Sequence, residues 1–234
     1  MTPARTPPIG LRFENIDKRY GGLYALRRVS LEIAPGECVA LAGRNGSGKT
    51  TLLRIAAQLV RPTAGKLTFS PAPNESERVS KNTGFVAHAT MVYDELTAEE
   101  NLLLFARLLE IPEATKSIEI LLREVGLFER RDSLVRTFSR GMRQRVAIAR
   151  ALLHQPSVLL LDEPATGLDP EGVTWLAATL RRLRDAGCTI LMSLHGESQI
   201  STLATRAIRL DAGAVVADTR TGANLRSILT FADA

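Results

Sequence analysis

Residues 43–50, with the sequence GRNGSGKT, combine glycines with a lysine and a threonine at the spacing of a phosphate-binding loop. Glycines let backbone N–H groups approach phosphate oxygens closely, and a helix that starts directly behind the loop adds its positive end. We expect Lys49 to bridge the β- and γ-phosphates of a nucleotide, and Thr50 to hold Mg²⁺ through its hydroxyl. The alternative is a glycine-rich turn without a ligand. The expected nucleotide contacts are Gly43, Asn45, Gly46, Ser47, Gly48, Lys49, Thr50 and Thr51.

Two neighbouring carboxylates, Asp162 and Glu163, follow the apolar run 158–161. Such a run is typical of a strand buried on both faces, and nucleotides bind in α/β sheets at the carboxyl ends of the strands. Asp162 is suited to the Mg²⁺ shell, and Glu163 to polarising the water that attacks the γ-phosphate. The alternative is that both acids only mark the start of a helix, with Pro164 behind them.

A sheet has to position both groups, and the chain begins with short β-rich runs at 11–16, 29–33 and 38–43. The last run leads directly into the glycine-rich loop, and residues 51–60 behind the loop have the apolar pattern of a helix packed on a sheet. The sequence therefore predicts one unit of strand, phosphate loop and helix. A further strand is predicted at 84–88.

Residues 97–154 interrupt this pattern with a helical one. It begins with a capping box, in which the side chains of Thr97 and Glu100 each accept a hydrogen bond from the backbone of the other residue. Apolar residues at helical spacing then mark successive helices. Behind them the α/β pattern returns with a strand at 189–194, and a hairpin is predicted to turn at 212–213.

Four features, in this order along the chain, resemble the motif set of the ABC ATPase family. They are GRNGSGKTTLL at 43–53, FSRGMRQRVAIARAL at 138–152, VLLLDEPATGLDP at 158–170, and His195 behind the strand TILMSL. The resemblance extends over nearly the whole chain. It implies a subunit that binds and hydrolyses ATP with Mg²⁺, and that works as one half of a nucleotide-sandwiching dimer. We expect the other half to be a second copy of this chain.

The resemblance also implies the fold class. It is α/β, with a P-loop NTPase (RecA-like) core sheet, an antiparallel β subdomain and an inserted helical subdomain that carries the signature motif of the family. The expected boundaries are 9–234 for a single domain, 9–88 and 156–218 for its core, 89–155 for the helical subdomain, and 1–8 and 219–234 for tails.

The stretch SRGM at 139–142 resembles that signature motif, with Arg140 where glycine is commoner. A serine hydroxyl and a glycine N–H at the start of a helix can together bind an anion. Because the chain's own phosphate loop already has its contacts, the resemblance implies that Ser139 and Gly141 contact the γ-phosphate held by the other subunit. The alternative is an ordinary helix N-cap.

Three further residues take their expected roles from the resemblance. Tyr20 resembles the aromatic residue that stacks on adenine, and Asp169 resembles the loop residue that faces the partner subunit. His195 resembles a switch histidine, which tells ATP from ADP by donating a hydrogen bond to the γ-phosphate. The alternatives are a core role for Tyr20 and a structural role for His195.

His88 departs from the family pattern, because most members have a glutamine there. That glutamine touches Mg²⁺ and relays the nucleotide state to the membrane subunit. The resemblance therefore implies that His88 lies beside nucleotide and metal, in a role that couples rather than catalyses. The alternative is a histidine hydrogen-bonded at the seam between the subdomains. Together with VYDELTAEENLLLFARL at 92–108, His88 resembles more narrowly the ATP-binding subunit of the cytochrome c maturation haem exporter.

Composition favours contact with a membrane only through partner proteins. No apolar run among the 234 residues approaches the ~20 that a membrane-spanning helix needs, and the start MTPARTPPIG lacks an apolar signal core. We expect a cytoplasmic chain that integral membrane subunits hold at the inner face of the cell membrane.

The net charge of +5 comes from scattered basic residues interleaved with acids, so no nucleic acid partner is expected. Cys38 and Cys188 are expected in the core.

Two functions compete for this sequence. The first is an ATPase that drives export through separate membrane subunits, with the groove between its subdomains as the mechanical contact. The second is a soluble ABC ATPase that acts on nucleic acid or ribosomes. Such relatives usually carry two cassettes or long coiled-coil insertions, and this sequence has neither. A scaffold without turnover is disfavoured by Glu163, which supplies a catalytic base.

Overall fold

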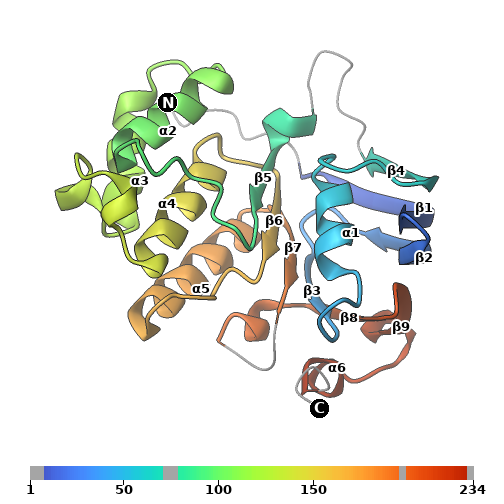
Figure 1. Ribbon diagram of the computed structural model, residues 1–234. Helices are drawn as coiled ribbons and strands as arrows, with labels where there is room; N and C mark the ends of the chain where they lie inside the picture. The colour runs from blue at the N-terminus through green and yellow to red at the C-terminus, as the bar shows by residue number, and fades with distance from the viewer. Residues whose placement is uncertain (1–7, 71–78, 195–198, 231–234) are drawn as a thin grey trace.

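The computed structural model describes residues 8–70, 79–194 and 199–230, which form a central sheet, a smaller sheet and a helical lobe (Figure 1). The central sheet has the strand order β5-β6-β7-β3-β8-β9. Its neighbouring strands are parallel except β8 and β9, which pair in antiparallel fashion at one edge. The strands are β3 (Cys38–Ala42), β5 (Thr83–Val86), β6 (Val158–Asp162), β7 (Thr189–Ser193), β8 (Arg206–Asp211) and β9 (Ala214–Asp218).

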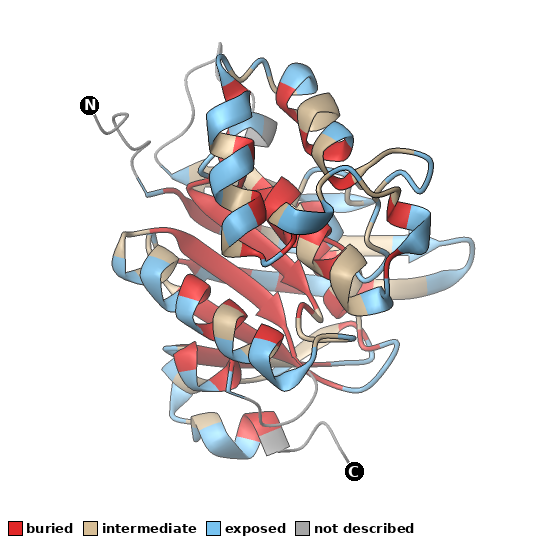
Figure 2. Cartoon of the chain, turned by 90° about the vertical axis from the view of Figure 1, so that its left-hand side faces the viewer, coloured by how far each residue is buried: buried red, intermediate tan, exposed pale blue. Residues whose placement is uncertain are grey.

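Both faces of the central sheet are covered, which explains why its strands are continuous apolar runs. Every residue of β3, β6 and β7 is buried. Figure 2 shows these strands as a buried layer beneath helices whose outer sides are exposed. Helix α1 (Lys49–Ala56) packs on one face, and α5 (Pro170–Asp185) packs on the other.

A second, antiparallel sheet has the order β2-β1-β4 and shares the apolar core of α1. Its strands are β1 (Gly10–Tyr20), β2 (Leu23–Ile33) and β4 (Ala64–Ser70). Residues alternate along the first part of β1, where Leu11 and Phe13 are buried and Arg12 is exposed. One face of this sheet therefore packs inward while the other meets solvent. The expected antiparallel β subdomain is confirmed.

The helical lobe consists of α2 (Ala98–Leu108), α3 (Ala114–Glu124) and α4 (Arg140–Leu152), with its own apolar core. The capping box before α2 is confirmed. The Glu100 N–H donates to Thr97 Oγ1 at 3.1 Å, and the Thr97 N–H donates to Glu100 Oε2 at 2.8 Å. Between Leu108 and Ala114 the chain turns, so α2 and α3 pack against each other within this lobe.

Short 3₁₀ turns and one further helix complete the described chain. They are η1 (Val79–Asn82), η2 (Phe128–Arg130), η3 (Val135–Thr137), η4 (Ser201–Leu203), η5 (Thr219–Thr221) and α6 (Leu225–Thr230). Ile228 and Leu229 of α6 are each 3% exposed and belong to the apolar cluster on the α5 face of the central sheet. The segment 219–230, expected to be a tail, is therefore part of the packed domain. Within the described residues, no helix combines the length and the apolar character needed to cross a bilayer.

The two cysteines lie in the core as predicted, and both are free thiols. Burial raises the pKa of Cys38 to about 12, against a smaller opposing effect of Arg184. The Cys38 thiol therefore stays protonated and unreactive at neutral pH.

A histidine directly behind α4 makes the stability of the fold depend on pH. Burial lowers the pKa of His154, against a smaller opposing effect of the Thr83 backbone. The unfolded chain therefore binds a proton on His154 at a higher pH than the folded chain does. Burying the neutral His154 ring therefore stabilises the fold fully above the unfolded pKa, near 6.5. This stabilisation is lost as the pH falls below that value, because the unfolded chain then gains a proton that the folded chain does not.

We expect His154→Phe to reduce the pH dependence of the free energy of unfolding between roughly pH 7.5 and pH 5. One proton accounts for a slope of at most about 1.4 kcal/mol per pH unit. Urea titrations of wild type and variant at several pH values measure the difference. Parallel pH profiles for the two proteins would contradict the role given to His154.

Candidate active site

The loop between β3 and α1 depends on glycine at two positions. Gly43 has φ 138°, and a Cβ there would lie 2.2 Å from the carbonyl oxygen of Leu210. Gly48 has φ 107°, and a Cβ there would lie 2.6 Å from the carbonyl oxygen of Ala25. A Cβ on Gly46 would instead meet no described atom within 4 Å. The loop is thus packed on one side and open on the other, where backbone N–H groups can approach a phosphate.

Lys49 opens α1 and is only 6% exposed. Its Nζ donates to the carbonyl oxygens of Gly43, at 2.5 Å, and Arg44, at 3.1 Å. Burial lowers the pKa of Lys49, whereas the carboxylates of Glu163 and Asp162 act to raise it. The ammonium group therefore lies between the loop and the two acids, at the positive end of α1.

Asp162 ends β6 and is 1% exposed. Its Oδ1 accepts a hydrogen bond from Ser193 Oγ at 2.7 Å. Its Oδ2 is buried and has no hydrogen-bond partner within the described residues. A buried carboxylate oxygen without a partner is suited to ligating a metal ion such as Mg²⁺.

Ser193 is a site residue that the sequence did not reveal. It lies opposite Asp162 in the β6–β7 register, and besides donating to Asp162 it accepts the Glu163 backbone N–H at 2.9 Å. Glu163 itself has the left-handed φ of 52°. One serine therefore holds both acidic residues in place. The only hint in the sequence is a hydroxyl at the end of an apolar strand, directly before the segment with His195.

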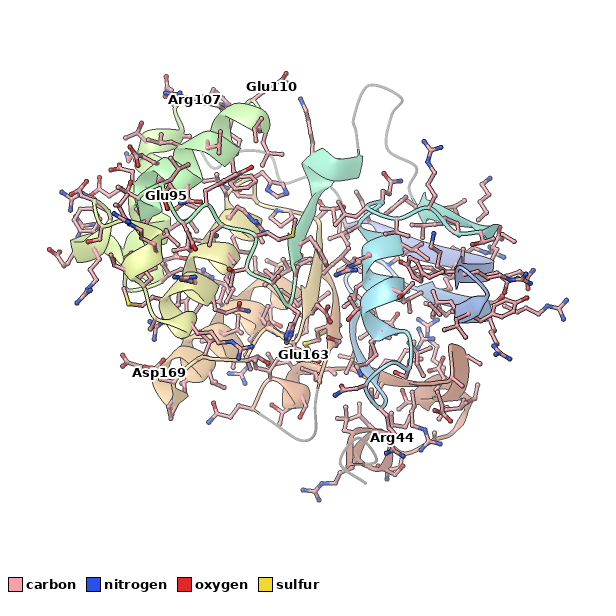
Figure 3. The ribbon with its side chains drawn as sticks, viewed as in Figure 1. Arg44, Glu95, Arg107, Glu110, Glu163 and Asp169 are labelled. Carbon is pink, nitrogen blue, oxygen red and sulfur yellow. The ribbon has the colours of Figure 1, made fainter. Side chains whose placement is uncertain are left out.

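The phosphate loop, Tyr20 and Glu163 line one cavity of about 270 Å³. Tyr20 ends β1 with half of its surface exposed, and the Lys18 ammonium lies 5.0 Å from the centre of its ring. In Figure 3, Glu163 lies in the lower half of the view, between Asp169 on the left and Arg44 of the loop on the right. The lining residues are Tyr20, Ala25, Asn45, Gly46, Ser47, Gly48, Lys49, Thr50, Thr51 and Glu163.

Ser139 and Gly141 lie instead in a second cavity, of about 350 Å³, whose described lining shares no residue with the first. Ser139 caps α4, and its Oγ accepts the Met142 N–H at 3.2 Å. A Cβ on Gly141 would lie 2.6 Å from the carbonyl oxygen of Gly167, so the start of α4 touches the loop before α5. The structure therefore keeps the signature residues apart from the phosphate loop of the same chain.

Asp169 lines this second cavity and caps α5. Its Oδ1 accepts the Gly172 N–H at 3.1 Å and a hydrogen bond from Arg145 at 2.8 Å, and the bond from Arg145 is the main cause of its lowered pKa. Sequence reasoning did not single out Arg145. Arg140, which stands where most family members have glycine, packs against Gly167. A Cβ at position 167 would lie only 2.9 Å from Arg140 Cγ, so the glycine leaves room for the arginine side chain.

Of the two histidines expected at the site, the structure describes His88 but not His195. The Nδ1 atom of His88 lies 3.3 Å from Glu163 Oε2, although His88 is not part of the described lining of the 270 Å³ cavity. His195 lies outside the described residues.

The chain is similar to known proteins over most of its length. The family described as ABC transporter matches residues 26–166. The Nod factor export ATP-binding protein I of Cupriavidus metallidurans is 34% identical over 212 residues, which cover 89% of this chain and 70% of that protein. The ABC transporter ATP-binding protein NatA of Bacillus subtilis is 39% identical over 197 residues, which cover 82% of this chain and 80% of that protein.

Solved structures are similar over the whole fold. One is a dimeric ATP-binding cassette in a post-hydrolysis state bound to ADP and Pi, with 28% identity, a TM-score of 0.81, and coverage of 89% of this chain and 97% of that one. Another is an ATP-binding subunit of an ABC transporter, with 28% identity, a TM-score of 0.83, and coverage of 93% and 97%.

Proposed function

Since this chain belongs to the ABC transporter family and is an ATP-binding and ATP-hydrolysing subunit, we propose that it powers export through separate membrane subunits. The observation that carries this proposal is the division of its site residues between two cavities. Lys49 and Glu163 line one cavity, and Ser139 and Asp169 line the other. A complete site then requires two chains, so ATP binding closes a dimer and hydrolysis reopens it.

Each residue has one role in this proposal. Tyr20 stacks on adenine, and Lys49 holds the β- and γ-phosphates. Thr50 and Asp162 hold Mg²⁺, which when bound neutralises phosphate charge. The unpartnered Oδ2 of Asp162 supports that role.

The remaining roles concern the γ-phosphate and the dimer. Glu163 polarises the attacking water, and its place on the same cavity as Lys49 supports this. Ser139 and Gly141 contact the γ-phosphate of the partner chain, with Asp169 facing that chain. His195 senses the γ-phosphate by analogy with the family.

A groove of about 610 Å³ between the core and the helical lobe supports contact with membrane subunits. Met91 and Tyr93 line it and are more than half exposed. Arg150 also lines it, donating to the carbonyl oxygens of Met91 at 2.5 Å and Phe85 at 3.1 Å, and lying 4.9 Å from the centre of the Phe105 ring. We infer that an apolar segment of the membrane subunit docks here and holds the chain at the inner face of the membrane.

We expect Tyr93→Glu to abolish co-purification of the chain with its membrane subunits from detergent, because a charge replaces the apolar surface of the groove. The matched control is Val216→Glu on β9, which changes an exposed apolar residue outside the groove. Co-expression with the membrane subunits, followed by affinity purification, gives the readout. Equal recovery of the complex with both variants would contradict docking in the groove.

The cargo and the soluble alternative can each be tested separately. Export agrees with the names of the Nod factor export relatives, and haem export rests only on His88 and the segment 92–108. A Soret absorption band in the purified complex would support haem as the cargo, and its absence after growth with haem would oppose it. Stimulation of ATP hydrolysis by RNA or ribosomes, rather than by membrane subunits, would favour the soluble alternative.

A further inference from the structure

His88 and Glu163 meet because they follow neighbouring parallel strands. β5 and β6 pair with Val86 opposite Leu161. Continuing this register by two residues places His88 opposite Glu163 at the carboxyl edge of the sheet. The side chains are then in contact, with 3.3 Å between His88 Nδ1 and Glu163 Oε2.

A bond to Ser193 holds the backbone of Glu163, whereas the orientation of its carboxylate depends on contacts of the side chain itself. The Glu163 N–H donates to Ser193 Oγ at 2.9 Å, and this bond acts on the main chain alone. The carboxylate lies several rotatable bonds away, so the Ser193 bond does not set its rotamer. A rigid imidazole at Oε2 favours one orientation of the carboxylate. The His88 side chain is 56% exposed, so packing does not force it into this position.

We propose that His88 is a positioning residue for Glu163, donating from Nδ1 to Oε2 so that the carboxylate faces the cavity with Lys49. This inference rests on the proposed role of Glu163 as the base that polarises water. An ionised carboxylate only accepts hydrogen bonds, so the neutral ring must carry its proton on Nδ1. His88 thus acts on hydrolysis itself, beyond the coupling role expected from the sequence.

The position of the donor atom makes this proposal specific to the residue type. In histidine, Nδ1 is bonded to Cγ, and the amide nitrogen of asparagine is bonded to the same carbon position. In glutamine the amide nitrogen is one bond farther from the backbone and corresponds to Nε2. Asparagine at position 88 therefore reproduces the donor, whereas the glutamine common in the family does not.

The first test is ATP hydrolysis by the full chain carrying His88→Ala, His88→Asn or His88→Gln, with Thr90→Ala on the same loop as control. We expect His88→Ala to lower kcat by about tenfold at unchanged KM, since displacing a reacting group by ~1 Å costs up to about a hundredfold. His88→Asn should restore most of the activity, His88→Gln should not, and Thr90→Ala should match wild type.

Three results would overturn the proposal. They are a kcat for His88→Ala within twofold of wild type, restoration by Gln but not by Asn, and an effect on KM alone. If wild type hydrolyses ATP, Glu163→Gln abolishes hydrolysis and His88→Ala has no effect, only the positioning role fails. A wild-type chain without ATPase activity would instead refute the proposed function.

A second test does not depend on turnover. The chain has three histidines, so ¹⁵N spectra of labelled imidazoles can be assigned by comparison with His88→Ala. At mildly alkaline pH without nucleotide, we expect the His88 ring of wild type to be protonated on Nδ1. In Glu163→Ala we expect it to change to the Nε2–H form that histidine prefers in water. The same tautomer in both proteins would overturn the proposed hydrogen bond.

Discussion

Glu163→Gln is expected to slow ATP hydrolysis by about 10³-fold while ATP still binds, because removal of a general base typically costs 10²- to 10⁴-fold. Glutamine has the shape of glutamate but does not accept a proton from water. The hydrogen bond from the residue 163 backbone to Ser193 is retained, so the loop geometry should not change. With hydrolysis blocked, the ATP-bound dimer should persist.

Single-turnover hydrolysis and light scattering with Mg-ATP measure these two effects. The matched control is Glu119→Gln, the same change on the exposed side of α3, where Glu119 pairs with Arg123. The control should hydrolyse ATP like wild type and return to monomer. A Glu163→Gln chain that stays monomeric with ATP, or that hydrolyses it normally, would refute both the base role and the dimer.

Lys49→Ala and Ser139→Arg are each expected to abolish hydrolysis, and a mixture of the two is expected to recover it. Lys49→Ala removes the cation held at the phosphate loop, and Ser139→Arg fills the signature site with a bulky side chain. In a mixed dimer, the Lys49 of one chain faces the intact Ser139 of the other. Random pairing gives about a quarter of wild-type activity if the two sites act independently.

The control mixes Lys49→Ala with Glu163→Gln, which affect the same cavity. Lys49 and Glu163 must both come from the same chain, and every chain in that mixture lacks one of them. No site is then complete, so no activity should return. Steady-state ATPase assays at constant total protein distinguish the two mixtures. Recovery in neither mixture, or in both, would show that the site is not shared between chains as proposed.

Local features of this protein were predictable from the sequence. The phosphate loop followed from GRNGSGKT, since glycine, lysine and threonine at that spacing need only the strand and helix on either side. The capping box at Thr97 and the turn at 212–213 were also predictable. These features depend on backbone preferences within a few residues, and residue type reports such preferences directly.

The contacts that combine these features were decided by the tertiary structure. Ser193 holds Asp162 and Glu163 because β6 and β7 pair in one register, and His88 reaches Glu163 because β5 pairs with β6. Nothing local to any of these residues specifies that register. It is set by hydrogen bonds between strands and by packing of helices on both faces of the sheet, and a shift of one residue would separate every pair.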